Sequence, residues 1–187
     1  MYERHCLGTF LWSPQTGALK STPTVRPYVA EPESYRDLVF NVSRTHGRVV
    51  CLVAWRRQIG VDVEDASRSI ETTEIAERFF STAEIRDLRA LPPSQQRIRF
   101  FAYWTLKESY VKARGVGLSI PLEKFSFNIT QRDSIRVRLD ASLQDDPHSW
   151  QFWPVTLGNR HPVAVAIFRK NETDLKIQVR EVIPPAG

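Results

Sequence analysis

The order of the predicted secondary-structure elements is the feature that most constrains the fold of this chain. Short apolar and β-branched runs come first, helical patterns occupy the middle, and strand-like runs return at the end. The predicted strands cover residues 38–42, 48–55, 59–64, 125–130, 134–139, 150–155, 163–168 and 175–182. Because the strands are grouped instead of alternating with helices, this order favours an α+β fold with antiparallel sheets over a βαβ winding.

Three helices are predicted in the middle of the chain. Residues 73–80 form a short amphipathic pattern. The second helix begins at Ser81, which makes a capping-box pattern with Glu84, because each side chain can satisfy the backbone amide of the other residue. The longest pattern, 95–114, follows two prolines and is followed by a glycine, the residue that most often ends a helix.

The polar stretch 65–69 separates the first strands from the helices. Such a break in the hydrophobic pattern is the best candidate for a domain boundary in this chain. The sequence therefore predicts an N-terminal half over residues 1–65, and a C-terminal half over residues 66–187.

Composition excludes several classes of protein. The chain has 187 residues, of which 42% are hydrophobic and 25% are charged, as is ordinary for a soluble globular protein. No apolar run approaches the roughly 20 residues that a membrane span needs. The N-terminus lacks the apolar core of a signal peptide, so we expect a cytoplasmic location. Cys6 and Cys51 are too few for a disulfide framework or a cysteine-based zinc site.

The chain is basic, with a formal net charge of +5 and a sequence pI of about 9.5. Its positive residues are scattered, so the charge alone is compatible with nucleic acid, acidic proteins or phosphorylated small molecules as partners. The sequence contains no glycine-rich phosphate loop and no dinucleotide-binding fingerprint.

Two pairs of charged residues suggest a metal site. Asp62 and Glu64 are two apart on a predicted strand and share a face, while Glu108 and Lys112 are four apart on a predicted helix and are neighbours. Buried carboxylates repel one another unless a cation lies between them, and oxygen ligands suit Mg²⁺. A solvated strand edge and a surface ion pair are the alternative interpretations of the same spacings.

Several spaced segments of this chain, taken together, resemble a known family. Gly60-Val61-Asp62-Val63-Glu64 and Trp104-Thr105-Leu106-Lys107-Glu108-Ser109-Tyr110-Val111-Lys112 are similar to the two signature motifs of the Sfp-type 4′-phosphopantetheinyl transferases. The flanking segments 40–43, 78–81 and 117–122 also match that branch. The resemblance covers residues 38 to about 129 well, is looser over the C-terminal strands, and is poor over residues 1–25.

The resemblance implies a fold and an activity. Members of this branch are monomers of two similar α+β halves, with coenzyme A bound in the cleft between the halves. They are holo-[carrier protein] synthases, which move the phosphopantetheine arm of coenzyme A to a serine of an apo acyl or peptidyl carrier protein and release 3′,5′-ADP. The resemblance therefore implies a cytoplasmic enzyme, with coenzyme A and a carrier protein as partners and with neither nucleic acid nor a membrane as a partner.

The resemblance also assigns roles to single residues. It gives Asp62, Glu64 and Glu108 to Mg²⁺, with Mn²⁺ as an alternative ion. Glu108 would also be the base for the incoming hydroxyl, and Lys112 would lie by the diphosphate. The implied coenzyme A contacts are Arg26, Ser43, Arg44, Lys107 and Lys112. Lys107 could equally be a solvated lysine.

Two departures from the family pattern leave other functions open. Arg44 stands where the family normally has a histidine, and the N-terminal half is short. A catalytically impaired homologue that only binds coenzyme A or a carrier protein is the main alternative. A metal-dependent nuclease is a further alternative, although its Glu and Lys would be two apart on a strand, whereas here they are four apart in a helical pattern.

Overall fold

The computed structural model describes residues 19–21, 27–29, 33–116, 119–130, 135–169, 172 and 175–182. The strands are β1 (Leu19–Ser21), β2 (Pro27–Val29), β3 (Leu38–Thr45), β4 (Arg48–Trp55), β5 (Ile59–Val63), β6 (Phe125–Ile129), β7 (Ile135–Leu139), β8 (Trp150–Leu157) and β9 (His161–Phe168). The α-helices are α1 (Thr72–Phe79), α2 (Thr82–Ala90) and α3 (Pro93–Arg114). Short 3₁₀ turns cover Glu33–Tyr35, Leu122–Lys124, Ala141–Leu143 and Pro147–Ser149. Within the described ranges, no helix has the length and apolar character to cross a membrane.

The sheets are antiparallel throughout the described part of the chain, which confirms the predicted α+β class. β5, β9 and β8 form a three-stranded sheet in that order, while β3–β4, β6–β7 and β1–β2 are separate pairs. The arrangement is consistent with two similar halves. The boundary predicted after residue 65 stays a prediction. β5 precedes this boundary but pairs with β9, which follows it.

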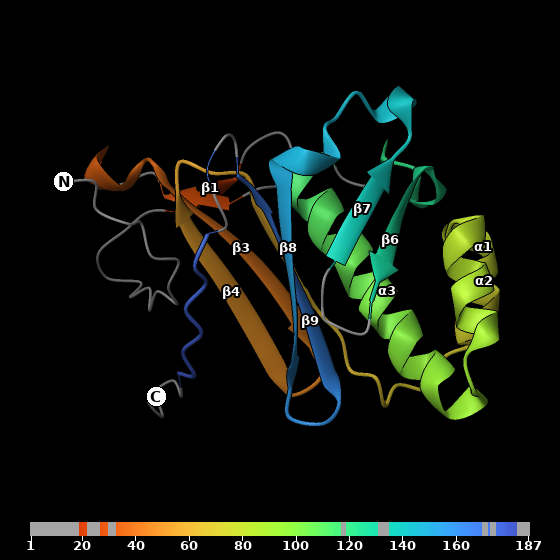
Figure 1. Ribbon diagram of the computed structural model, residues 1–187. Coiled ribbons are helices and arrows are strands. Elements are labelled where there is room, and N and C mark those ends of the chain that lie inside the picture. Colours follow the sequence, from red (N-terminus) through yellow and green to blue (C-terminus); the bar gives the residue numbers. More distant parts are fainter. Residues whose placement is uncertain are drawn as a thin grey trace.

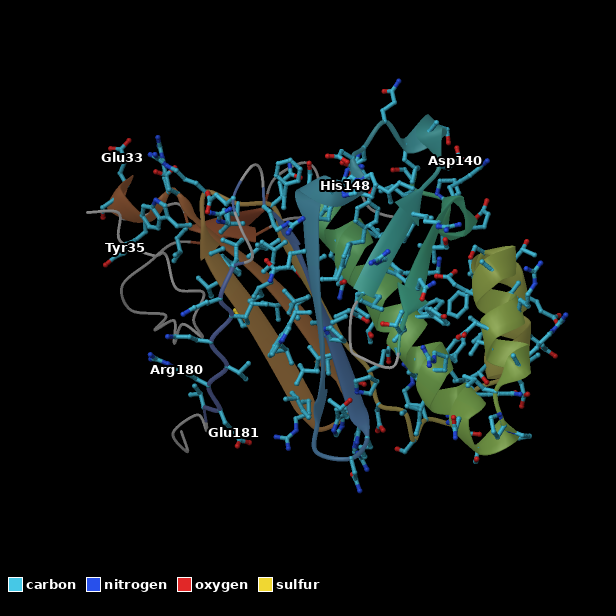
Figure 2. All side chains as sticks on the ribbon, viewed as in Figure 1. Glu33, Tyr35, Asp140, His148, Arg180 and Glu181 are labelled. Carbon is cyan, nitrogen blue, oxygen red and sulfur yellow. The ribbon has the colours of Figure 1, made fainter. Side chains whose placement is uncertain are left out.

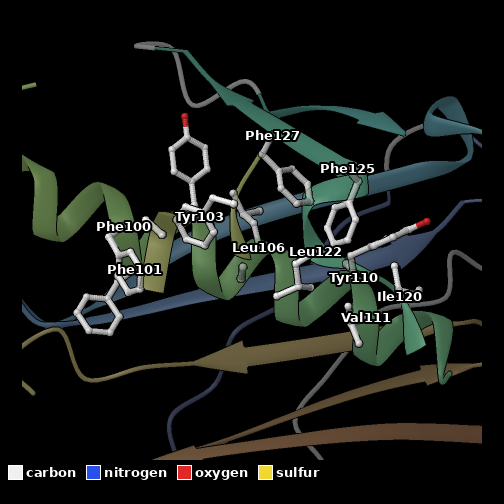
Figure 3. Close-up of a cluster of buried hydrophobic side chains, with 14 of the residues drawn as sticks. Phe100, Phe101, Tyr103, Leu106, Tyr110, Val111, Ile120, Leu122, Phe125 and Phe127 are labelled. Carbon is white, nitrogen blue, oxygen red and sulfur yellow. The ribbon is translucent and has the colours of Figure 1, made fainter. Parts of the chain in front are cut away.

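The long helix α3 lies at the centre of the molecule. Figure 1 shows α3 between the sheet of β5, β9 and β8 and the elements β6, β7, α1 and α2. Its aromatic side chains pack on two neighbours. The rings of Phe100, Tyr103 and Trp104 contact Phe80 at the end of α1. Nearer the C-terminus of α3, the rings of Tyr110 and Phe125 of β6 have centroids 4.9 Å apart (Figure 3). Because α3 is covered on more than one side, apolar residues occur around most of its circumference.

Gly60 brings α3 unusually close to β5. A Cβ atom built on Gly60 would lie 2.1 Å from the Ser109 carbonyl oxygen and 2.4 Å from the Ala113 amide nitrogen. Only glycine leaves room for this approach between helix backbone and strand backbone. The close contact holds the end of β5, where Asp62 lies, against the C-terminal half of α3.

The helix boundaries largely follow the prediction. The capping box at the start of α2 is confirmed, because the Glu84 amide donates to Ser81 Oγ (3.3 Å) and the Ser81 amide donates to Glu84 Oε2 (2.9 Å). α3 begins earlier than the predicted residue 95, because Pro93 occupies its first turn, where the missing amide proton costs nothing.

The predicted strand over residues 175–182 is wrong. Only Ile177 forms an isolated bridge there. The side-chain amide of Gln151 occupies both backbone groups of Leu175, accepting from its N–H at 2.7 Å and donating to its C=O at 3.0 Å. A side chain thus takes the hydrogen bonds that a strand ladder would need. The segment that carries Arg180 and Glu181 runs beside β4 (Figure 2). Arg48 Nη1 of β4 lies 3.3 Å from Glu181 Oε1.

Candidate active site

Three elements that are distant in the sequence bring Ser43, Asp62 and Lys112 together. Ser43 comes from β3, Asp62 from β5 and Lys112 from the last turn of α3. Lys112 Nζ donates to Asp62 Oδ1 at 2.7 Å and to Ser43 Oγ at 3.0 Å. Ser43 Oγ in turn donates to Asp62 Oδ1 at 2.9 Å. The cluster therefore lies where the predicted N-terminal half meets the helix of the predicted C-terminal half.

The side chains of β3 take the place of a backbone ladder beside β5. Asn41 Oδ1 accepts from the Val61 amide at 2.9 Å, and Ser43 Oγ accepts from the Val63 amide at 3.2 Å. Asn41 and Ser43 are two apart on β3 and so face the same side. Sequence reasoning did not assign a role to Asn41, although this spacing from Ser43 was the available signal.

Asp62 has one oxygen without a partner. Its side chain is almost fully buried, and its Oδ2 is a buried atom with no hydrogen bond. Burial raises the pKa of the Asp62 carboxyl above its ordinary value, while the Lys112 charge and the hydrogen bonds from Lys112 and Ser43 oppose that rise. A buried carboxylate oxygen that lacks a partner is costly, so the site has an unsatisfied acceptor that a cation can satisfy.

Glu108 is close enough to the other carboxylates to respond to their charge. Burial raises the pKa of the partly buried Glu108 carboxyl, the negative charges of Asp62 and Glu64 raise it further, and Lys112 lowers it. Glu64 lies just past the end of β5, where its Oε2 accepts from Arg68 Nη1 at 2.9 Å. Asp62, Glu64 and Glu108, the three predicted metal ligands, are therefore close enough that the charges of the first two affect the pKa of the third.

The chemistry of this donor set fits a hard divalent cation. The set consists of three carboxylates, one of which has a buried oxygen in need of a positive charge. Within the described ranges, no three acidic, histidine or cysteine side chains are already arranged as a metal cage. Lys112 and Arg68 instead neutralise Asp62 and Glu64.

Lys107 is the clearest correction to the sequence interpretation. Its side chain is 0% exposed, so it is not a solvated lysine, and it has no surface with which to contact coenzyme A. Lys107 Nζ lies 2.8 Å from Glu84 Oε2, which is also 0% exposed, and donates to two backbone carbonyl oxygens at 2.8 and 2.7 Å. Burial lowers the pKa of the Lys107 ammonium, and the charge of Glu84 opposes this. Lys107 is therefore a buried core residue that links α3 to Glu84 of α2 and to the backbone of residues 122 and 125.

Of the other predicted coenzyme A contacts, the structure brings only some together. Arg26 lies outside the described residues. Arg44 follows Ser43 on β3, and because adjacent strand residues point to opposite faces, its exposed side chain is not brought to the cluster. Ser43 and Lys112 are thus the two predicted coenzyme A contacts that the structure places together.

Known proteins are similar to this chain over the region that contains Asp62, Glu108 and Lys112. Residues 58–166 match the model of the 4′-phosphopantetheinyl transferase superfamily. The chain is 37% identical over 114 residues to a 4′-phosphopantetheinyl transferase of Bacillus subtilis, a match that covers 61% of this chain and 48% of that protein. It is 32% identical over 142 residues to the 4′-phosphopantetheinyl transferase HetI of a Nostoc species, covering 76% of this chain and 56% of that protein.

A solved structure shares the fold. It is a holo-(acyl-carrier-protein) synthase of Bacillus anthracis in complex with coenzyme A, with a TM-score of 0.50 and 19% identity over 59% of this chain and 93% of that chain. The chain spans about half the length of the curated relatives it matches. The matched family region nevertheless covers more than half of this chain and contains β5 and the whole of α3. The chain therefore belongs to the 4′-phosphopantetheinyl transferase superfamily.

Proposed function

We propose that this protein transfers the 4′-phosphopantetheine arm of coenzyme A to a serine of an apo acyl or peptidyl carrier protein. The proposal is carried by Asp62, Glu108 and Lys112, which combine one buried and one partly buried carboxylate with an ammonium group in the region that matches the family. The names of the curated relatives support the same reaction. In this reaction the serine Oγ forms a bond to the phosphorus that carries the pantetheine arm. The bond between this phosphorus and the bridging oxygen of the diphosphate breaks, and 3′,5′-ADP leaves with that oxygen.

Asp62, Glu64 and Glu108 are the residues that would hold Mg²⁺ or Mn²⁺. When bound, the ion supplies positive charge that neutralises the diphosphate of coenzyme A. The orphaned Asp62 Oδ2 supports this assignment.

Two residues of α3 have distinct chemical roles in the proposal. Glu108 accepts the proton of the incoming serine hydroxyl, a role that suits a carboxylate whose pKa is raised by burial and by its acidic neighbours. Lys112 offsets the negative charge that develops on the leaving phosphate oxygen. Both side chains are fixed by α3, whose position against β5 depends on the close approach at Gly60.

The remaining parts of the proposal follow from the resemblance. Ser43, Arg44 and Arg26 are proposed contacts of the coenzyme A phosphates, because a hydroxyl and two guanidinium groups all donate hydrogen bonds to phosphate oxygens. We also propose that the protein acts as a monomer in the cytoplasm, that neither nucleic acid nor a membrane is its partner, and that its halves divide after residue 65.

Mass spectrometry of an apo carrier protein tests the reaction directly. After incubation with this protein, coenzyme A and Mg²⁺, the carrier should gain the mass of one phosphopantetheine group. Glu108→Gln should lower the rate by about a hundredfold or more, because it removes the base and one metal ligand, while the melting temperature changes little. The matched control is Glu74→Gln, an exposed position on α1. If the carrier gains no mass but still binds the protein, the impaired homologue is the correct interpretation.

A further inference from the structure

Lys112 is held in a small cage of oxygen atoms. Its Nζ donates to Asp62 Oδ1 at 2.7 Å, to Ser43 Oγ at 3.0 Å and to the Val61 carbonyl oxygen at 3.2 Å. One carboxylate, one hydroxyl and one backbone carbonyl are also the kinds of donor that surround a hard metal ion in proteins. The Lys112 ammonium is thus surrounded by the kinds of oxygen donor that would suit a hard metal ion.

The Asp62 carboxylate is the partner of the Lys112 ammonium and is also a proposed ligand of the metal ion. Asp62 neutralises Lys112 in this structure, yet its buried Oδ2 still lacks a partner. A divalent ion bound to Asp62 would be repelled by the ammonium that is hydrogen-bonded to the other oxygen of the same carboxylate. Because the site is largely buried, solvent screens this repulsion only weakly.

A diphosphate offers the ammonium another partner. Lys112 is 28% exposed, in contrast to the 7% exposed side chain of Asp62, so its flexible side chain has solvent on one side into which it can move. A diphosphate bound on the exposed side of Lys112 would add negative charge there, and a lysine ammonium binds phosphate oxygens well. If Lys112 moves from Asp62 to the diphosphate, both oxygens of Asp62 become available to a metal ion.

We propose that Lys112 is the internal counter-ion of Asp62 in the absence of metal, and that a diphosphate ligand releases Asp62 for a divalent cation. This inference rests on the proposed function, because it assumes that coenzyme A binds beside Asp62. It makes metal binding and coenzyme A binding mutually dependent. By thermodynamic linkage, each ligand increases the binding affinity of the other by the same factor.

The coupling can be measured without any transfer reaction. Mn²⁺ binding is followed by electron paramagnetic resonance of the free ion, for the protein alone and for the protein with coenzyme A, with Mn²⁺ bound by coenzyme A alone subtracted. Wild-type protein should bind Mn²⁺ about tenfold or more tightly when coenzyme A is present. Lys112→Met should bind Mn²⁺ about tenfold more tightly than wild type in the absence of coenzyme A, and coenzyme A should strengthen Mn²⁺ binding less than it does in wild type, because only the direct attraction between ion and diphosphate remains.

Three further variants complete the design. Lys112→Gln removes the charge but keeps a hydrogen-bond donor, so it replaces the Met variant if that variant fails to fold. Lys112→Arg keeps the charge and should retain most of the coupling. Lys124→Met removes the same charge from a half-exposed surface lysine on the 3₁₀ turn before β6, and should behave as wild type.

The outcomes separate this inference from the proposed function. The inference is overturned if the neutral variants bind Mn²⁺ alone no more tightly than wild type, or if wild type shows no coupling between Mn²⁺ and coenzyme A. Either result can occur in a protein that still modifies the carrier protein. Conversely, a protein that fails the transfer assay can still show the predicted coupling, since the binding measurement requires no carrier protein.

Discussion

The buried ion pair of Lys107 and Glu84 allows a quantitative prediction. Both side chains are 0% exposed, and their charged atoms are 2.8 Å apart. Glu84 Oε1 also accepts from the Phe127 amide at 2.9 Å, so one carboxylate links α2, α3 and β6. Lys107→Met removes the ammonium and leaves this carboxylate buried without its counter-charge. We expect the free energy of unfolding to fall by about 3–5 kcal/mol, as for other broken buried pairs.

A double-mutant cycle separates the charge effect from the loss of packing. In Lys107→Met combined with Glu84→Gln, no uncompensated charge remains inside the core. The free energy of unfolding of the double variant should therefore be about 1–3 kcal/mol higher than the value obtained by adding the losses of the two single variants. Urea unfolding followed by tryptophan fluorescence gives the required free energies. A loss below about 1 kcal/mol in Lys107→Met, or strictly additive changes, would refute the reasoning. Lys124→Met is again the matched control, because its pair with Asp140 spans 3.9 Å at the surface.

Two further predictions concern the frame of the site. Gly60→Ala should lower the free energy of unfolding by about 3 kcal/mol and reduce transfer, because its new methyl group would lie 2.1 Å from a carbonyl oxygen of α3; wild-type thermal stability would contradict this. The second concerns Asp65, whose pKa is lowered from its ordinary value of 3.8 by hydrogen bonds from Ser67 and by the charges of Arg160 and His161. The stability that ionised Asp65 contributes should be complete above that value and should disappear as the pH falls through the lowered pKa. In acid unfolding curves, Asp65→Asn should therefore differ from wild type at neutral pH and converge with it at low pH; a constant difference would contradict the assignment.

The sequence predicted the backbone better than the contacts of its charged residues. Strands β3 to β9, the capping box at Ser81 and the long helix follow from local patterns, which depend on near neighbours in the chain. The Glu108–Lys112 spacing predicted neighbours on one helix, but it could not show that Lys112 binds Asp62 and Ser43. Those partners come from strands far away in the sequence.

Lys107 illustrates the same limit. A lysine in a helix is normally solvated. The residues three and four positions away from it on the helix, which are Tyr103, Trp104, Tyr110 and Val111, are aromatic or apolar and were the available signal of burial. Its partner Glu84 lies on another helix, where the capping-box pattern already accounted for its presence. The wrong strand over residues 175–182 has a related cause. The hydrogen bonds from the Gln151 side chain to the Leu175 backbone join residues far apart in the sequence, and hydrophobic periodicity does not predict them.

Side chains occupy the backbone hydrogen-bonding groups on the side of β5 that faces away from β9. β5 pairs with β9 on one side only. On its other side, the Val61 amide, the Val61 carbonyl and the Val63 amide are occupied by Asn41, Lys112 and Ser43. An open strand edge with free amides and carbonyls is a template on which a second chain can add and begin to aggregate. Asn41, Ser43 and Lys112 therefore keep this edge closed, and we expect substitutions of Ser43 or Lys112 to carry a risk of aggregation in addition to any effect on the proposed reaction.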